Sequence, residues 1–226
     1  MAAYDKVARQ YSEVFNNINL RCFEWKWLKK TIQKLKPDSL LDIGCGNGYL
    51  LNALTPIIPN LYGIEPCAPM FRIAEERVGG KAVLRNAPAE NIPFENEKFD
   101  AAVSFLSFRY MEWNKAIPEI ARILKPDGIF IIIDLFAARF IFLKIPAYSV
   151  TFIKTRLQYF MNRNFHKKLV ELSRNADWQK MVNENPKREF TDAKKALEKQ
   201  FNIINEKILC HSINGMTIGI ICKKPV

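Results

Sequence analysis

Apolar residues along this 226-residue chain follow two patterns that alternate over the first 134 positions. Short continuous apolar runs predict buried strands at residues 39–43, 61–65, 82–85, 99–105 and 129–134. Between these runs, apolar residues recur every three or four positions and predict helices at residues 47–58, 69–78 and 115–124. Strands that alternate with helices in this way favour a parallel sheet with helices on both faces.

The N-terminal part of the chain has only helical spacing. Residues 5–16 and 20–35 are amphipathic, and we expect residues 1–36 to form a helical cap. The second helix places apolar residues on one face and lysines largely on the other, at Lys26, Lys29, Lys30 and Lys34. It is expected to end before Pro37, because the residue before a proline is disfavoured in a helix.

The C-terminal part has the pattern of a hairpin. A predicted helix at residues 192–200 precedes two strand-like runs at 201–210 and 216–223, and Asn214-Gly215 between the runs is a hairpin signal. The fold class we expect is therefore α/β. A seven-stranded sheet, parallel except for a C-terminal antiparallel hairpin, would have helices on both faces, and residues 1–226 would form one domain.

Residues 137–189 separate the fifth predicted strand from the last helix and are expected to form a helical lid insertion. Eleven Lys or Arg face four Asp or Glu there, so the segment carries +7 of the chain's net charge of +11. Phenylalanines and tyrosines are interleaved with these basic residues. The composition fits an apolar substrate, an anionic lipid surface, stacked bases with phosphates, or simply a solvated cap.

Cysteine and hydropathy patterns narrow the class of protein further. Five cysteines without a C-x-x-C pair, and two histidines, indicate neither a disulfide framework nor a metal site. Residues 1–10 lack the apolar region of a signal peptide. The longest apolar stretch, residues 128–153, is interrupted by charges and a proline and does not read as a membrane span. We expect a soluble, cytoplasmic protein without a metal.

A glycine-rich turn follows the first predicted strand, in the sequence LLDIGCGNG at residues 40–48. Gly44 and Gly46 permit positive φ angles and let a ligand approach the backbone, beside the free N–H groups of a helix start. Asp42 stands two residues before the first glycine, and position 49 is Tyr where a dinucleotide-binding motif has glycine. Glu65 ends the next predicted strand, where a carboxylate can accept hydrogen bonds from both hydroxyls of a ribose.

This turn resembles motif I of the Rossmann-like, class I methyltransferases that bind S-adenosylmethionine, and the chain is similar to the type 11 methyltransferases. Tyr4, Asp5, Ala8 and Tyr11 resemble the Y-D-x-x-A-x-x-Y opening of many members, which folds over the cofactor. Residues 89–94 with 99–100 resemble the D-A-E-x-L-P-F…F-D stretch, and residues 121–128 resemble R-x-L-K-P-G-G. The matches occur in the family's order and cover residues 4–134.

The resemblance implies S-adenosylmethionine as cofactor and a set of residues around it: Tyr4, Tyr11, Asp42, Gly44, Cys45, Gly46, Glu65, Pro66, Ala89, Glu90, Ser104 and Phe105. Pro88 replaces the acid that the family has before Ala89, so the N–H of Ala89 remains as the contact to adenine.

The catalytic group is not identified, because in-line methyl transfer needs a base only when the acceptor must lose a proton. The weak candidates are Arg109 and Tyr110 after the fourth strand, Asp134 at the end of the fifth, and His166 by elimination. Each of these residues could equally be a packing residue or a surface residue without a role in catalysis.

Three functions remain open on the sequence. The first is methylation of a small molecule, apolar or anionic, admitted under the lid, with contact to an anionic membrane surface through that lid. The second is RNA methylation, which is less favoured because Ser104-Phe105-Leu106-Ser107 stands where an N-P-P-Y/F tetrapeptide would follow the fourth strand. The third is a cofactor-binding scaffold that has lost activity, which the lack of an obvious base keeps open.

Overall fold

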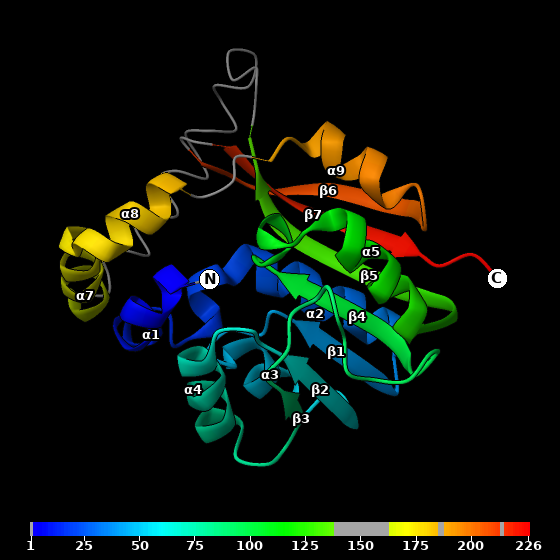
Figure 1. Ribbon diagram of the computed structural model, residues 1–226, viewed down its shortest axis with the longest axis horizontal. Helices are drawn as coiled ribbons and strands as arrows, with labels where there is room; N and C mark the ends of the chain where they lie inside the picture. The colour runs from blue at the N-terminus through cyan, green and yellow to red at the C-terminus, as the bar shows by residue number, and fades with distance from the viewer. Residues whose placement is uncertain (1, 138–162, 185–187, 213–214) are drawn as a thin grey trace.

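A computed structural model describes residues 2–137, 163–184, 188–212 and 215–226. Seven strands form one sheet in the order β3-β2-β1-β4-β5-β7-β6 (Figure 1). Their bounds are β1 Ser39–Ile43, β2 Asn60–Ile64, β3 Val83–Arg85, β4 Phe99–Phe105, β5 Leu124–Phe136, β6 Asn202–Ser212 and β7 Gly215–Lys223. β1 to β5 are parallel, and β7 runs antiparallel to both β5 and β6. The predicted fold class is confirmed.

Helices cover both faces of the sheet, as the alternating pattern predicted. On one face the apolar side chains of α2 Cys22–Leu35, α3 Tyr49–Leu54 and α4 Ala68–Val78 pack against the strands. On the other face lie α5 Trp113–Ile123 and α9 Phe190–Leu197. Neighbouring residues of the central strands, such as Ala101 and Ala102, are buried on opposite faces, which explains why these strands read as continuous apolar runs.

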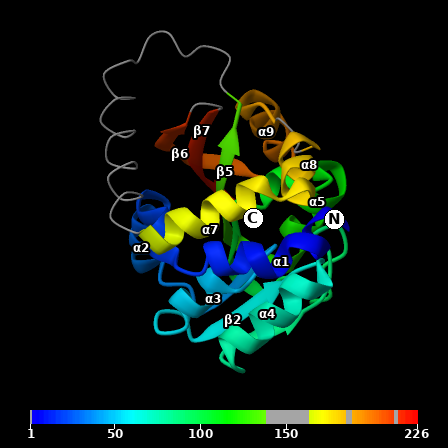
Figure 2. The same ribbon diagram turned by 90° about the vertical axis from the view of Figure 1, so that its left-hand side faces the viewer.

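Three more helices lie beyond the carboxyl ends of β1, β2 and β4. They are α1 Ala2–Val14, α7 Arg163–Arg174 and α8 Ala176–Glu184, and Figure 2 shows α7 beside α1. Val14 of α1 packs against the fully buried Leu172 of α7, and the Tyr11 ring lies 5.8 Å from the Trp178 ring of α8. Residues 163–184 of the expected lid are thus two helices docked on the N-terminal helix. Residues 138–162 lie outside the described part.

Some element bounds differ from the predicted ones. The helix predicted at 47–58 is the shorter α3, because Gly48 has φ +73° at its start and Pro56 has no N–H to continue its ladder. Lys125 to Gly128, at the end of the segment that resembles R-x-L-K-P-G-G, loop out of the ladder between β5 and β4. The register of that ladder resumes at Ala101 and Ile129. The predicted Asn214 corner lies outside the described residues.

β6 is the outer strand of the sheet, and its pairing with β7 shifts register twice, between Ile203 and Asn205 and between Ile208 and Cys210. Short 3-10 turns stand at Ile18–Arg21 (η1) and Phe108–Tyr110 (η2). No helix in the described part of the chain is long and apolar enough to cross a membrane.

Candidate cofactor site

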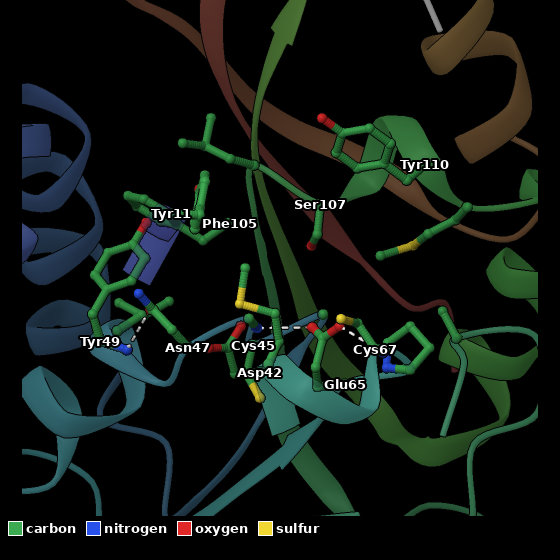
Figure 3. A pocket seen from close by; sticks show the side chains of 18 of the residues that line it. Tyr11, Asp42, Cys45, Asn47, Tyr49, Glu65, Cys67, Phe105, Ser107 and Tyr110 are labelled. Atoms are coloured by element: carbon green, nitrogen blue, oxygen red, sulfur yellow. Dashed lines mark hydrogen bonds between the residues drawn. The ribbon is translucent and has the colours of Figure 1, made fainter. Parts of the chain in front are cut away.

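A cavity of about 400 Å³ opens at the carboxyl edge of the sheet, between the ends of β1, β2 and β4 and the helices α1 and α8. This edge is where ligands bind in open parallel sheets. Figure 3 shows Asp42, Cys45 and Glu65 together on one side of the cavity and Tyr110 on another. Its lining is Tyr11, Asp42, Gly44, Cys45, Gly46, Asn47, Tyr49, Leu50, Glu65, Pro66, Cys67, Met70, Ala89, Glu90, Phe105, Leu106, Ser107, Tyr110, Met111, Met181 and Glu184.

Two glycines of the turn after β1 differ in what surrounds them. Gly44 and Gly46 have φ of +72° and +56°, angles that an L side chain rarely adopts. A Cβ on Gly44 would lie 2.7 Å from the Cβ of Ser107, whereas a Cβ on Gly46 would meet no atom within 4 Å. Gly44 is therefore needed for packing. Gly46 lines the cavity, and the open space beside its Cα leaves room for a ligand.

Glu65 is held in one orientation by two backbone N–H groups. Gly46 donates to its Oε2 at 2.8 Å and Cys67 donates to its Oε1 at 2.9 Å. Burial raises the pKa of Glu65, which is only 7% exposed, and the two N–H groups counter part of that rise. Each carboxylate oxygen keeps a further lone pair, so the group can accept two more hydrogen bonds from neighbouring hydroxyls.

Asp42 is buried beside this cavity without a hydrogen-bond donor. The residue is 1% exposed, and neither carboxylate oxygen has a partner among the described residues. Burial, with the nearby Glu65 as a second cause, raises the pKa of Asp42 well above its usual range. A buried carboxylate in this state is costly unless a cation or a donor reaches it.

Ser104 is not among the residues that line the cavity, and its hydroxyl contacts another serine. It is fully buried, and its Oγ lies 2.7 Å from the Oγ of Ser107. Ser107 donates to the carbonyl oxygen of Ile43 at 2.6 Å, so the Ser104 hydroxyl is left as the donor between the two serines. Ser107 is the serine that lines the cavity.

Asn47 joins the glycine turn to α1. Its Nδ2 donates to Ser12 Oγ at 3.2 Å and to the carbonyl oxygen of Phe15 at 2.8 Å. Arg77 of α4 donates to the Asn47 carbonyl oxygen at 2.8 Å and to Ser12 Oγ at 3.2 Å. This buried network fixes α1, and with it Tyr11, against the cavity. In the sequence, only the position of Asn47 in the glycine turn pointed to this linking role.

Arg109 and Asp134, two of the catalytic candidates, bind each other and do not line the cavity. Arg109 Nη2 lies 2.6 Å from Asp134 Oδ1, and the Arg109 N–H donates to Asp134 Oδ2 at 2.8 Å. Burial raises the pKa of Asp134, and the charge of Arg109 opposes the rise. The geometry makes this pair structural, so a catalytic role for either residue is not supported.

Tyr110 is the catalytic candidate that does line the cavity, and its side chain is 39% exposed. Around it the wall is mostly apolar, with Phe105, Leu106, Met111 and Met181. Met181 and Glu184 come from α8, far along the chain, and no local pattern marked them. The side chains of Tyr4 and His166 are outside the description, although both residues lie in helices, α1 and α7. No described group of three His, Cys, Asp or Glu is arranged to hold a metal.

The fold is an open, mostly parallel α/β sheet with a glycine turn after β1. An oriented carboxylate follows β2, and a cavity lies at the strand ends, where ligands bind in such sheets. Comparison with known proteins is more specific. Residues 41–132 match the family model described as "Methyltransferase domain". The match supports a class I, S-adenosylmethionine-dependent methyltransferase domain at residues 41–132, and the resemblance seen in the motifs is confirmed.

Two curated relatives match part of the chain. An uncharacterized protein, MJ1252, of Methanocaldococcus jannaschii is 36% identical over 129 residues, which are 57% of this chain and 48% of that protein. The demethylmenaquinone methyltransferase of Thermotoga maritima is 28% identical over 142 residues, 60% of this chain and 61% of that protein. The matches therefore span about half to three fifths of these relatives' lengths.

A solved structure shares the fold over nearly the whole chain. It is the putative methyltransferase of Haloferax volcanii in complex with the Trm112 methyltransferase activator, with a TM-score of 0.66 and 16% identity. The alignment covers 99% of this chain and 98% of that one.

Proposed function

We propose that this protein transfers a methyl group from S-adenosylmethionine to a small, largely apolar molecule. The observation that carries the proposal is the unpaired, buried carboxylate of Asp42 at the wall of a cavity in a methyltransferase domain. A cationic ligand would compensate that charge. S-adenosylmethionine carries an ammonium and a sulfonium group, and the sulfonium supplies a methyl group that a nucleophile takes directly.

The other lining residues fit the remaining parts of this cofactor. Glu65 has two oriented acceptor positions for the hydroxyls of a ribose. The open backbone at Gly46 admits a ligand without a Cβ in its way. Ala89, which lines the cavity, offers its N–H to adenine, as the motif implies. Tyr11 on α1 and Met181 on α8 cover the cavity and exclude water.

The acceptor is expected to be apolar because of the wall around Tyr110. Among the described lining residues there is no Lys or Arg, so the described part of the site offers no partner for an anionic acceptor. The name of the Thermotoga maritima relative, a demethylmenaquinone methyltransferase, agrees with an apolar acceptor. Contact of the basic lid with an anionic surface stays a prediction, since residues 138–162 lie outside the described part.

The test has two stages. Calorimetry should show micromolar binding of S-adenosylmethionine and S-adenosylhomocysteine, about −8 kcal/mol, and no binding of NAD. Turnover is then followed with a methyl-labelled cofactor and a cell extract divided into an organic-solvent fraction, an RNA fraction and a protein fraction. We expect label in the organic-solvent fraction.

Each other result selects another function. Binding of NAD alone would overturn the cofactor assignment. Label in RNA would select the RNA methyltransferase, and cofactor binding without label in any fraction would select the inactive scaffold. Because the Haloferax volcanii neighbour was solved with an activator, both stages should be run with and without an added activator protein of that kind.

A further inference from the structure

One face of α2 carries lysines that no part of the cofactor site uses. Lys26, Lys29, Lys30 and Lys34 are all exposed and fall within two and a half turns of the helix. The opposite face holds the buried Leu28 and Ile32. The helix is thus fixed to the sheet by its apolar side and presents only lysines and Gln33 to the outside. We call these four residues the α2 lysine face.

The α2 lysine face lacks the ion pairs that other lysines of this chain have. Elsewhere, Lys98, Lys125 and Lys194 each reach a carboxylate within 2.9 Å. Within the described chain, no carboxylate pairs with any lysine of the α2 lysine face. Moreover, Lys26, Lys30 and Lys34 follow one another at a spacing of four, where like charges destabilise a helix. A row of unpaired like charges that weakens its own helix calls for an anionic partner.

The basic surface continues onto the edge of the sheet. Lys207 of β6 stands opposite Gly219 of β7, and directly opposed residues of antiparallel strands share a face of the sheet. The ring of Trp27 packs against Gly219, so Lys207 lies on the face that α2 covers. Lys207 is exposed, and Ile204 on the same edge strand is 53% exposed.

We propose that the α2 lysine face, extended by Lys207, docks this protein on an anionic lipid surface. Lysine is a compact, strongly hydrated charge that suits the diffuse charge of lipid headgroups, and clusters of four or more on an amphipathic helix are typical of such contacts. Nucleic-acid surfaces use arginine and stacking aromatic rings. The α2 lysine face has no arginine, and the tryptophans of α2, Trp25 and Trp27, pack inward. This inference goes beyond the proposed methyl transfer and does not depend on it.

The experiment measures binding of the full chain to vesicles of phosphatidylcholine alone and with about 30% phosphatidylglycerol. Wild type should bind only the anionic vesicles, and less at about 0.3 M than at 0.05 M salt. The variant Lys26→Gln/Lys30→Gln/Lys34→Gln should bind roughly 100-fold more weakly, from the loss of three lysines near the surface. Replacement of the same residues by Arg should retain binding.

A matched variant separates the α2 lysine face from net charge. Lys81→Gln/Lys195→Gln/Lys199→Gln removes the same charge from exposed lysines on other surfaces and should bind like wild type. An equal loss in this variant, or no vesicle binding by wild type, would overturn the proposal. Tighter binding of a labelled RNA than of anionic vesicles, lost in the α2 variant, would make the face a nucleic-acid surface instead. Calorimetry with S-adenosylmethionine keeps the two proposals apart, since the α2 variant should bind the cofactor unchanged.

Discussion

Ser107 occupies the space in front of Gly44, so that a Cβ on Gly44 would lie 2.7 Å from the Cβ of Ser107. Ser107 also donates to the carbonyl oxygen of Ile43 at 2.6 Å. The loop after β4 and the turn after β1 therefore hold each other in place. Gly46, two residues later, has no such neighbour. The two glycines of one motif serve different ends, the first packing and the second ligand access.

Alanine substitution should separate these two roles. Gly44→Ala should lower the free energy of unfolding by about 3 kcal/mol, because backbone strain of about 1–2 kcal/mol adds to a clash with Ser107. Gly46→Ala should lower the free energy of unfolding only by the backbone strain, yet it should weaken cofactor binding more than tenfold. Gly46→Val should abolish cofactor binding. Chemical denaturation and calorimetry measure the two effects.

Gly79→Ala is the control, since Gly79 has φ +58°, no atom within 4 Å of its Cβ position, and a place away from the cavity. This variant should have a lower free energy of unfolding, from the backbone strain alone, and an unchanged cofactor affinity. Equal losses of affinity in the Gly46 and Gly79 variants would contradict a ligand at Gly46.

Asp42→Asn should weaken S-adenosylmethionine binding by tenfold or more while stabilising the free protein above acidic pH. Burial raises the folded-state pKa of Asp42 well above its ordinary value of 3.8. As pH rises from 3.8 to that raised pKa, the unfolded chain ionises first, so the free energy of unfolding falls and then levels off. In the Asn variant the free energy of unfolding should not fall with pH in this way. Chemical denaturation at several pH values measures the difference.

Cofactor binding to wild type should also release a proton, because a cationic ligand favours the ionised form of Asp42. Below the raised pKa, affinity should therefore increase with pH. Calorimetry in two buffers of different ionisation enthalpy detects the released proton, and the Asn variant should release none from this group. A pH-independent affinity in wild type would mean that Asp42 does not face the cation.

Glu65→Gln should weaken binding of the cofactor about tenfold or more, because the amide NH₂ would face an N–H donor of Gly46 or Cys67 and lose one oriented acceptor. The informative ligand is a 2′-deoxy analogue of S-adenosylhomocysteine. Wild type should bind the analogue more weakly than the parent, whereas the variant should discriminate little between them. Undiminished discrimination would place the ribose elsewhere.

Asp134→Ala should destabilise the protein by about 3–5 kcal/mol, because it leaves the largely buried guanidinium of Arg109, 12% exposed, without its partner. The double variant Asp134→Ala/Arg109→Met should recover much of that loss, since neither charge then remains. Thermal unfolding of the three proteins tests this. Cofactor affinity of the double variant should stay near wild type; a loss of more than tenfold would restore this pair as candidates for the site.

Local pattern was enough to predict most of the fold. β4 runs from Phe99 to Phe105 as the apolar run indicated, because a strand buried on both faces is apolar at nearly every position. Asp100 and Ser104 are the two polar residues of this strand. The hairpin of β6 and β7 followed from alternation and a turn signal. The predicted ends of helices were wrong where a single residue determines the end. Pro56, for example, ends α3 several residues before the predicted end at residue 58.

The candidate site was predictable only in its local part. The glycine turn and Glu65 sit at fixed spacings and formed a motif. Ser107 and Met181 carry no such signal, because their roles depend on contacts with Gly44 and with the cavity that only the folded chain creates. The same holds for Asp134: its place near a strand end was visible in the sequence, but its ion pair with Arg109 was not.

β6 presents an eleven-residue edge, Asn202–Ser212, whose outer side pairs with no other described strand. An open edge of this length is a template for strands of neighbouring molecules, and so for aggregation. The two register shifts of β6 break that template into short pieces, and Glu206 and Lys207 place charges in the middle piece. We therefore expect that a second copy cannot extend the sheet by a continuous ladder, and that this edge resists edge-to-edge association in concentrated protein.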